Sequence, residues 1–112
     1  MKLPNPEQAI VEMQKLTGYC LSFEHSDGRH KAYVFRSALG LTVDNAEELR
    51  STLLEAVQRY DAIVGKSNLQ GQKYVIEFPM TRMNQTATIR SGWIIRHNED
   101  FPRLVTCYIV RK

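Results

Sequence analysis

Hydrophobic residues recur at helical spacing through the first half of the chain and alternate with polar residues through the second half. A first helix is predicted to end near Ser22, although Gly18 weakens a single continuous helix. Its apolar positions are Ile10, Met13, Leu16 and Leu21. A polar loop over residues 23–30 then separates this helix from the next one.

Two further helices follow in the pattern. One begins at His30 and stops at Gly40, a natural C-terminal cap. The other takes Asp44 as its N-cap, with Glu47 three residues later as in a capping box. Its apolar stripe consists of Leu49, Leu53, Ala56, Val57 and Tyr60. Both helices therefore have one face suited to a core.

Beyond residue 72 the apolar period changes from helical to two. Residues 73–81, 86–97 and 103–110 alternate and are separated by turn signals, which predicts a β-meander. Residues 62–72 are predicted as a loop, and Pro79 suggests that the first strand is an edge strand or bulged. We expect one α+β domain over residues 1–112. Its N-terminal helices pack on one face of a three- or four-stranded antiparallel sheet.

A sheet covered by helices on one face leaves its second face to solvent. We expect the core-facing positions of the last two strands to be Ile89, Trp93, Ile95, Val105, Cys107 and Ile109. Arg90, Thr106 and Tyr108 then lie as neighbours on the open face, which Glu77 shares. An ordinary solvated face would also carry such polar residues, and a slip of one residue would exchange the two faces.

Composition narrows the class of protein. At 43% hydrophobic and 24% charged residues, the 112-residue chain has material for one core. No apolar run reaches the roughly 20 residues that cross a bilayer, and no secretory segment follows Met1. These features predict a cytoplasmic protein, or a module of a larger one, without a membrane partner. Cys20 and Cys107 are expected to be buried, uncrosslinked hydrophobes. The net charge of +3 permits a polyanionic partner.

Three basic residues, Arg29, His30 and Lys31, occupy the first turn of the second predicted helix, where the helix dipole disfavours cations. On a helical wheel, Lys31 falls within the apolar arc of that helix. A bound anion would resolve this conflict, because a helix N-terminus offers free N–H groups and Lys31 and Arg29 add charge. Alternatively, all three side chains extend into water at a cost of about 0.3–1 kcal/mol each.

No metal or cofactor is predicted. His25 and His30 are five positions apart across a glycine loop, and His97 is remote, so the histidines have no standard ligand spacing. The sequence also lacks the G-x-S-x-G signature of a serine nucleophile.

Several longer segments resemble a poorly characterised bacterial family of small stand-alone proteins and C-terminal modules of polymorphic toxins. The resemblance covers Leu3 to Val110 and is carried by LPN, KLTGYCL, GRHKAYVFRSALG, DNAEELRSTLLEA, ATIRSGWII and DFPRLVTCYIV. The order of elements is also similar to the barnase–EndoU–colicin–RelE toxin ribonucleases, whose active site lies on the open face of the sheet. That second likeness is an analogy of architecture.

This resemblance implies a metal-independent endoribonuclease acting on tRNA or mRNA, so we expect the protein to be an enzyme. The expected catalytic residues are His30, Lys31, Arg90, Thr106 and Tyr108, and the expected substrate-binding residues are Arg29, Ser91 and Arg103. Glu77 or Tyr108 would have to supply the second proton transfer. The implied partners are an RNA substrate and an acidic antitoxin or immunity protein. The sequence leaves open whether the protein forms a homodimer. The alternative is a non-catalytic module that binds nucleic acid or protein through the same basic face.

Overall fold

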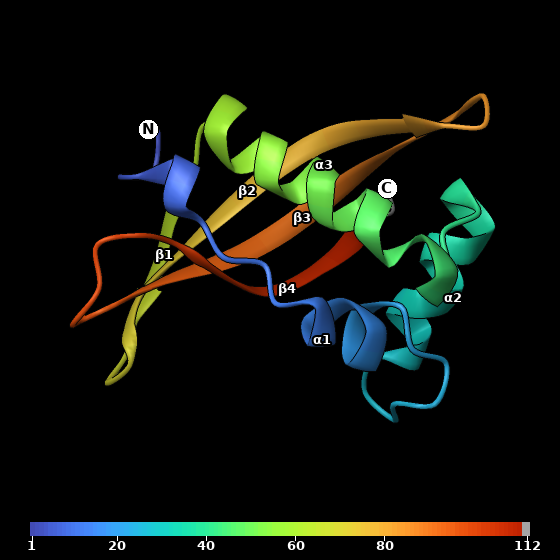
Figure 1. Cartoon of the computed structure of the whole chain (residues 1–112), viewed down its shortest axis with the longest axis horizontal. Coiled ribbons are helices and arrows are strands. Elements are labelled where there is room, and N and C mark those ends of the chain that lie inside the picture. Colours follow the sequence, from blue (N-terminus) through green and yellow to red (C-terminus); the bar gives the residue numbers. More distant parts are fainter. Residues whose placement is uncertain (111–112) are drawn as a thin grey trace.

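Four antiparallel strands form a sheet in which each strand pairs with the next one along the chain, in the order β1-β2-β3-β4. The computed structural model describes residues 1–110. The strands are β1 (Ile63–Ser67), β2 (Gly71–Arg82), β3 (Gln85–Arg96) and β4 (Arg103–Val110). The predicted meander is therefore confirmed (Figure 1).

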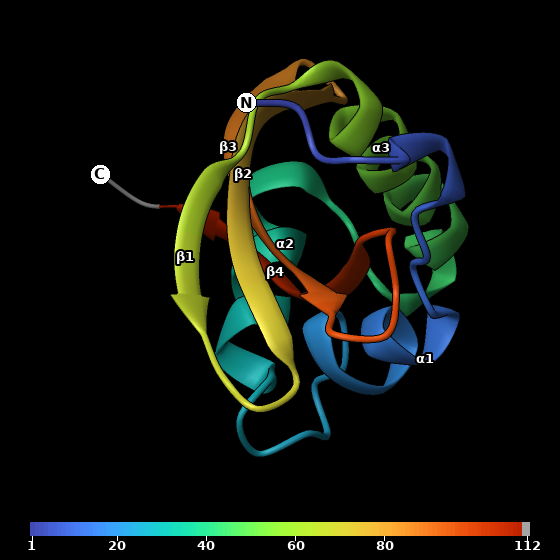
Figure 2. The ribbon, with the colours of Figure 1, turned by 90° about the vertical axis from the view of Figure 1, so that its left-hand side faces the viewer.

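Helical segments precede the sheet in the chain and cover it. They are η1 (Pro6–Gln8), α1 (Met13–Lys15), η2 (Leu16–Cys20), α2 (Arg29–Leu39), η3 (Val43–Asn45) and α3 (Ala46–Arg59). In the end-on view, α1 and α3 lie on the same side of the sheet (Figure 2). The predicted α+β architecture is confirmed. Across the described residues, no helix is both long and apolar enough to cross a membrane.

The first predicted helix is shorter than its apolar spacing suggested. α1 and the π-helical turn η2 together begin only at Met13, and Ile10 forms an isolated parallel bridge with Arg103 instead. The Ile10 N–H donates to the Pro102 carbonyl at 3.0 Å, and the Leu104 N–H donates to the Ile10 carbonyl at 2.9 Å. Pairing with the exposed edge of β4 thus replaces helical hydrogen bonds at this position.

The second and third helices confirm the sequence pattern with one correction at a cap. α2 ends at Gly40, which adopts the left-handed conformation at φ 66°. The prediction that Asp44 is the N-cap of the third predicted helix was wrong. Thr42 caps η3 and forms a reciprocal capping box with Asn45, and the Asp44 N–H donates to the Thr42 hydroxyl. A short 3₁₀ turn before α3 accounts for this displacement.

The β2–β3 hairpin is continuous from Gly71–Arg96 to Arg82–Gln85, and its two turn residues, Met83 and Asn84, both have positive φ. Such a turn matches the twist of the flanking strands. The predicted loop over residues 62–72 was wrong in part, because it contains β1. All five residues of β1 are exposed, so they carry no alternation. Pro79 lies where β2 extends beyond its pairing with β1, and there β2 is an edge.

A β-bulge changes which residues of β4 face the core. Gly92 pairs with Thr106, but the next residue, Trp93, pairs with Leu104. The prediction that Val105 faces inward was therefore wrong, because Val105 is the extra residue of the bulge and Leu104 is buried in its place. Beyond the bulge, Cys107 and Ile109 are buried as expected.

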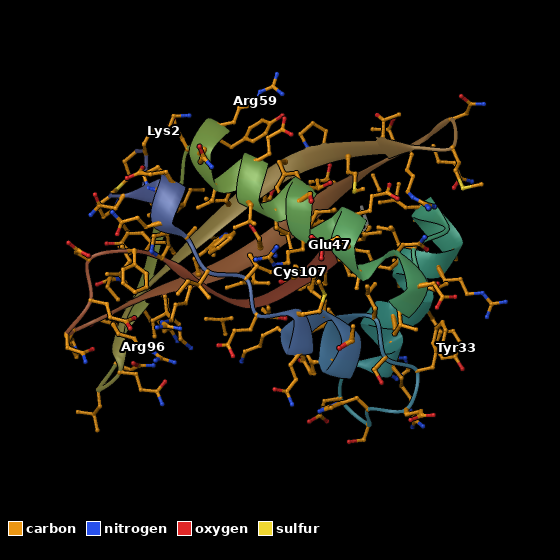
Figure 3. The ribbon with its side chains drawn as sticks, viewed as in Figure 1. Lys2, Tyr33, Glu47, Arg59, Arg96 and Cys107 are labelled. Atoms are coloured by element: carbon orange, nitrogen blue, oxygen red, sulfur yellow. The ribbon has the colours of Figure 1, made fainter. Side chains whose placement is uncertain are left out.

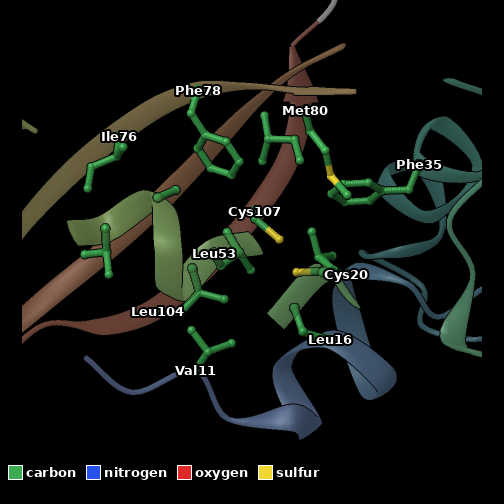
Figure 4. Packing of buried hydrophobic residues seen from close by; sticks show 14 of the residues in the cluster. Val11, Leu16, Cys20, Phe35, Leu53, Ile76, Phe78, Met80, Leu104 and Cys107 are labelled. Carbon is green, nitrogen blue, oxygen red and sulfur yellow. The ribbon is translucent and has the colours of Figure 1, made fainter. Parts of the chain in front are cut away.

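The core lies between α3, α2 and the inner face of the sheet. Trp93, Phe35 and Phe78 are its largest fully buried side chains, and Tyr60 at the end of α3 stacks on Phe78 at 5.9 Å. Both cysteines are fully buried and unbridged, as predicted. Their sulfur atoms point toward one another between η2 and β4 (Figure 4).

Ser91 belongs to this core and not to a substrate site. It has no exposed surface, its hydroxyl donates to the Ile76 carbonyl at 2.8 Å, and the Trp93 indole N–H donates to it at 2.9 Å. The expectation that Ser91 binds substrate was wrong, because its position in the β3 alternation directs it inward.

Replacing Ser91 with alanine leaves the buried indole N–H of Trp93 without an acceptor. We expect Ser91→Ala to lower the free energy of unfolding by about 1–3 kcal/mol, measured by urea denaturation. Ser51→Ala, an exposed change on α3, is the matched control and should have little effect. Equal stability of the two variants would contradict the assigned role.

Candidate functional site

Lys31 joins three segments at the edge of β4. From the first turn of α2, its Nζ donates to the Tyr19 hydroxyl in η2 at 2.7 Å and to the Thr106 hydroxyl in β4 at 3.3 Å. The ammonium also lies 4.6 Å from the centre of the Tyr19 ring. Lys31 and Thr106 are 75 positions apart in sequence, so the fold brings together two residues that the sequence placed in one site.

A second cation reaches the same place from the open face of the sheet. Glu77, Arg90 and Tyr108 form one cross-strand row of β2, β3 and β4. Arg90 Nη1 donates to the Tyr108 hydroxyl at 3.3 Å, and the guanidinium pairs with Glu77. The hydrogen bond to Tyr108 makes the largest contribution to raising the pKa of Arg90, and the bond to Glu77 raises it further. Arg90, Thr106 and Tyr108 therefore lie on the open face, as expected.

Both cations lie close to the ring of Tyr108. Lys31 Nζ is 5.4 Å and the Arg90 guanidinium carbon 5.9 Å from its centre. The two charges differ in their compensation. Arg90 has a carboxylate partner, whereas none of the salt bridges within residues 1–110 includes Lys31, whose partners are hydroxyls and aromatic rings. Lys31 thus retains a positive charge that an anion can neutralise.

Lys31 and Thr106 line a hollow of about 560 Å³ at the β4 edge, which we call the larger hollow. Its lining also includes Glu12, Lys15, Tyr19, His25 and Val105. Val105 is the residue that the bulge turns away from the core, so the bulge shapes this hollow. β-Bulges often redirect side chains beside binding sites. The volume is within the range typical of small-molecule sites.

His25 was missed by the sequence reasoning, although it lines the larger hollow. Its Nδ1 accepts hydrogen bonds from the Asp27 and Gly28 N–H groups, both at 3.1 Å, and its ring meets Tyr19 edge-on at 4.8 Å. Because Nδ1 is an acceptor, the proton of the neutral ring is on Nε2. His25 can therefore donate a hydrogen bond to a ligand. A His-x-x-Gly sequence before a helix is too common to have indicated this role.

The same contacts correct the expected anion site at the start of α2. The Gly28 N–H is taken by the His25 ring, and the Arg29 N–H donates to the His25 carbonyl at 2.9 Å. The Gly28 and Arg29 N–H groups are therefore bonded to His25 and are not presented to a phosphate. The basic first turn contributes to the site through the Lys31 side chain instead.

The remaining predicted residues lie outside this cluster. Arg29 and His30 are exposed and do not line the larger hollow. Arg103 forms a two-pronged ion pair with Glu99, with both N–O distances at 2.8 Å, which raises the pKa of Arg103 and lowers that of Glu99. Figure 3 shows the side chains around these strands.

The Cys20 thiol lies behind the site, beside Cys107. The neighbouring Cys107 side chain lowers the pKa of Cys20 to about 7 against the opposing effect of burial, with smaller contributions from Thr106 and the charge of Lys31. Burial and the bond to Cys20 raise the pKa of Cys107. In residues 1–110, no three His, Cys, Asp or Glu side chains gather in a way that could hold a metal ion.

The chain belongs to the family described as Domain of unknown function (DUF6883), whose model matches residues 2–111. No curated protein matches the sequence. A chain in the solved structure of a contact-dependent growth inhibition toxin–immunity protein complex from Klebsiella pneumoniae 342 is similar in fold, with a TM-score of 0.70. The match covers 96% of this chain and 97% of that chain at 10% sequence identity, so it demonstrates a shared fold and no more.

Gly28 allows the close approach of η2 and α2 that brings Tyr19 to Lys31. A Cβ atom at Gly28 would lie 2.3 Å from the Tyr19 carbonyl oxygen, whereas one at Gly18 meets its nearest atom at 3.7 Å. We expect Gly28→Ala to lower the free energy of unfolding by roughly 0.5–3 kcal/mol in urea denaturation. Gly18→Ala, in the same segment, should be neutral or slightly stabilising. A Gly28 variant as stable as the Gly18 variant would contradict this packing.

Proposed function

We propose that this protein is a toxin-type, metal-independent endoribonuclease that acts with a cognate immunity or antitoxin protein. The observation that carries the proposal is the convergence of Lys31 and Arg90 on Tyr108, with Lys31 Nζ 5.4 Å and the Arg90 guanidinium carbon 5.9 Å from the centre of its ring. Two cations from distant segments, together with the Thr106 hydroxyl, suit one phosphodiester group.

The proposed reaction is transphosphorylation of RNA. A base removes the proton from a ribose 2′-hydroxyl, and the oxygen attacks the adjacent phosphorus. The bond from phosphorus to the 5′ oxygen breaks, and an acid protonates that oxygen, which leaves a 2′,3′-cyclic phosphate. The two cations stabilise the additional charge that develops on the phosphoryl oxygens.

The residues divide between holding the phosphate and moving protons. Lys31 and Arg90 bind the phosphoryl oxygens, and Thr106 donates a further hydrogen bond. Tyr108 stacks on a base or supplies a proton. His30 precedes Lys31 on the exposed side of α2, and we assign it the proton transfer at the ribose. Glu77, which Arg90 holds, is the alternative base.

The fold comparison supports the toxin part of the proposal. The similar chain comes from a contact-dependent growth inhibition toxin–immunity protein complex, and the two chains align over nearly their full lengths. This supports a toxin-like architecture with an immunity partner. RNA as the substrate rests on the site chemistry and on the likeness to the barnase–EndoU–colicin–RelE group.

An acidic partner fits the same site. A carboxylate-rich surface that covers Lys31 and Arg90 would block phosphate binding and gain charge complementarity. A protein that inhibits this toxin should therefore bind Lys31→Met more weakly than wild type in calorimetric titration. Equal binding of both would show that the partner covers another surface.

One observation favours a second function, a non-catalytic nucleic-acid-binding module. His30 lies outside the larger hollow, and His25 is fixed by two N–H donors as a hydrogen-bond donor rather than a base. A module that only binds RNA would need Lys31 and Arg90 but no proton acceptor. His30→Gln separates the two functions, because general acid–base catalysis is worth about 10²–10⁴ in rate.

We expect the purified protein to cleave total tRNA in the presence of EDTA and to leave cyclic phosphate ends. Lys31→Met and Arg90→Ala should each lower the cleavage rate by roughly 10²–10³, since each removes a charge that stabilises the transition state. The matched control is Arg36→Ala, an exposed cation farther along α2 whose guanidinium lies 5.8 Å from the Phe23 ring. Gel electrophoresis of labelled tRNA measures the rates.

Each outcome decides between the alternatives. Intact tRNA and intact ribosomal RNA after prolonged incubation would rule out the ribonuclease. Cleavage that disappears with EDTA would rule out the metal-independent mechanism. A His30→Gln variant that retains wild-type cleavage would transfer the proton-transfer role to Glu77 or Tyr108.

A further inference from the structure

A second, smaller hollow of about 130 Å³ adjoins the larger one on the open side of the sheet. The two share Glu12, Lys15 and Val105 in their linings, so the bulged residue and the end of α1 separate them. Lys73 of β2, Arg96 of β3 and Arg103 of β4 complete its basic rim. None of these residues was required by the proposed cleavage site, except Arg103 as a predicted substrate contact.

The charge of this smaller hollow is unevenly compensated. Glu99 takes up the charge of Arg103, and Glu12 is the one acidic residue that the described chain contributes to the lining. Lys15, Lys73 and Arg96 form no salt bridge among residues 1–110. The charge of Arg96 also contributes to lowering the pKa of Glu99, but none of these three cations contacts a carboxylate of the described residues directly. The concave surface that they line therefore favours an anion.

The shared lining connects the cations of the two sites. Lys31 and Arg90 lie near Tyr108, Lys31 and Lys15 line the larger hollow, and Lys15, Lys73 and Arg96 line the smaller one. Ile94 is 93% hidden at the floor of the smaller hollow although it lies on the outer face, where a solvated strand would carry a polar residue. Cations next to an apolar side chain suit a polyanion that has regularly spaced charges and apolar faces.

We propose that the smaller hollow is a second phosphate subsite for single-stranded RNA, formed by Lys15, Lys73 and Arg96. This proposal rests on the ribonuclease function in one respect: it places the scissile phosphate of the RNA strand at Lys31 and Arg90. The strand runs from there past Lys15 and over the bulge at Val105. Its phosphates bind the second group of cations, so longer RNAs bind more tightly than short ones.

The test is direct binding of a fluorescein-labelled dodecanucleotide of 2′-O-methyl RNA, followed by fluorescence anisotropy. Such RNA has no attacking hydroxyl, so binding is measured whether or not the protein cleaves RNA. Two lost phosphate contacts should reduce the slope of log affinity against log salt by about 1.4. We therefore expect Lys73→Ala/Arg96→Ala to weaken binding by roughly 25-fold near 0.1 M salt.

Two comparisons make the effect specific. A labelled trinucleotide, too short to reach both groups of cations, should lose less than about twofold in affinity from the same change. The matched control is Lys2→Ala/Arg59→Ala, which removes the same charge from residues near the top of the view in Figure 3, whereas Arg96 is near the bottom. Both control residues have acidic partners. Its dodecanucleotide affinity should stay close to wild type.

The possible failures are distinct. Unchanged dodecanucleotide affinity in Lys73→Ala/Arg96→Ala, or an equal loss in the control variant, overturns the subsite even if the protein cleaves RNA. Length-dependent binding that these changes weaken supports the subsite even if cleavage is never observed, and then only the ribonuclease fails. Wild-type protein that binds a polyglutamate peptide but not the dodecanucleotide overturns the subsite in favour of an acidic protein partner.

Discussion

The contact of the Lys31 ammonium with Tyr19, Thr106 and Tyr108 is the interaction on which the candidate site depends. It joins η2, α2 and β4 where the sheet would otherwise end in an open edge. Hydroxyl dipoles and aromatic faces stabilise a cation, but they do not neutralise it as a carboxylate would. The site is therefore held together by the same charge that makes it attractive to an anion, which couples the packing of the edge to its ability to bind.

The edge strand β4 explains why the site lies here. Its first residues are covered by the bridge to Ile10, and its later ones by α2 and η2. The bulge at Val105 separates these two stretches and shifts the alternation by one residue. An edge covered in this way is protected from pairing with other chains. The larger hollow lies at this edge and is lined by the bulged residue Val105 and by Thr106.

The local periodicity of the sequence predicted most of the fold and part of the candidate site. The helical wheel that placed Lys31 in an apolar arc, and the alternation that placed Arg90 and Tyr108 outward, were both correct because each depends on a few neighbouring residues. β1 has no buried side, Thr42 caps a 3₁₀ turn that the apolar pattern does not register, and the bulge at Val105 depends on strand pairing. His25 is oriented by hydrogen bonds from backbone N–H groups, and such bonds cannot be inferred from residue types. These features arise from tertiary contacts that a single sequence does not encode locally.

Lys31 also departs from what packing alone would select. An apolar side chain of similar length would fill the arc between Tyr19 and Tyr108 without the cost of desolvating an ammonium group. Keeping a charge at this position therefore costs stability unless the ammonium also binds a ligand. Residues that packing alone would not select are expected at functional positions. Arg90, by contrast, has Glu77, so its charge alone would be explained by a cross-strand pair. The case for an anion therefore rests more on Lys31 than on Arg90, and the second cation matters because it lies beside the same tyrosine ring.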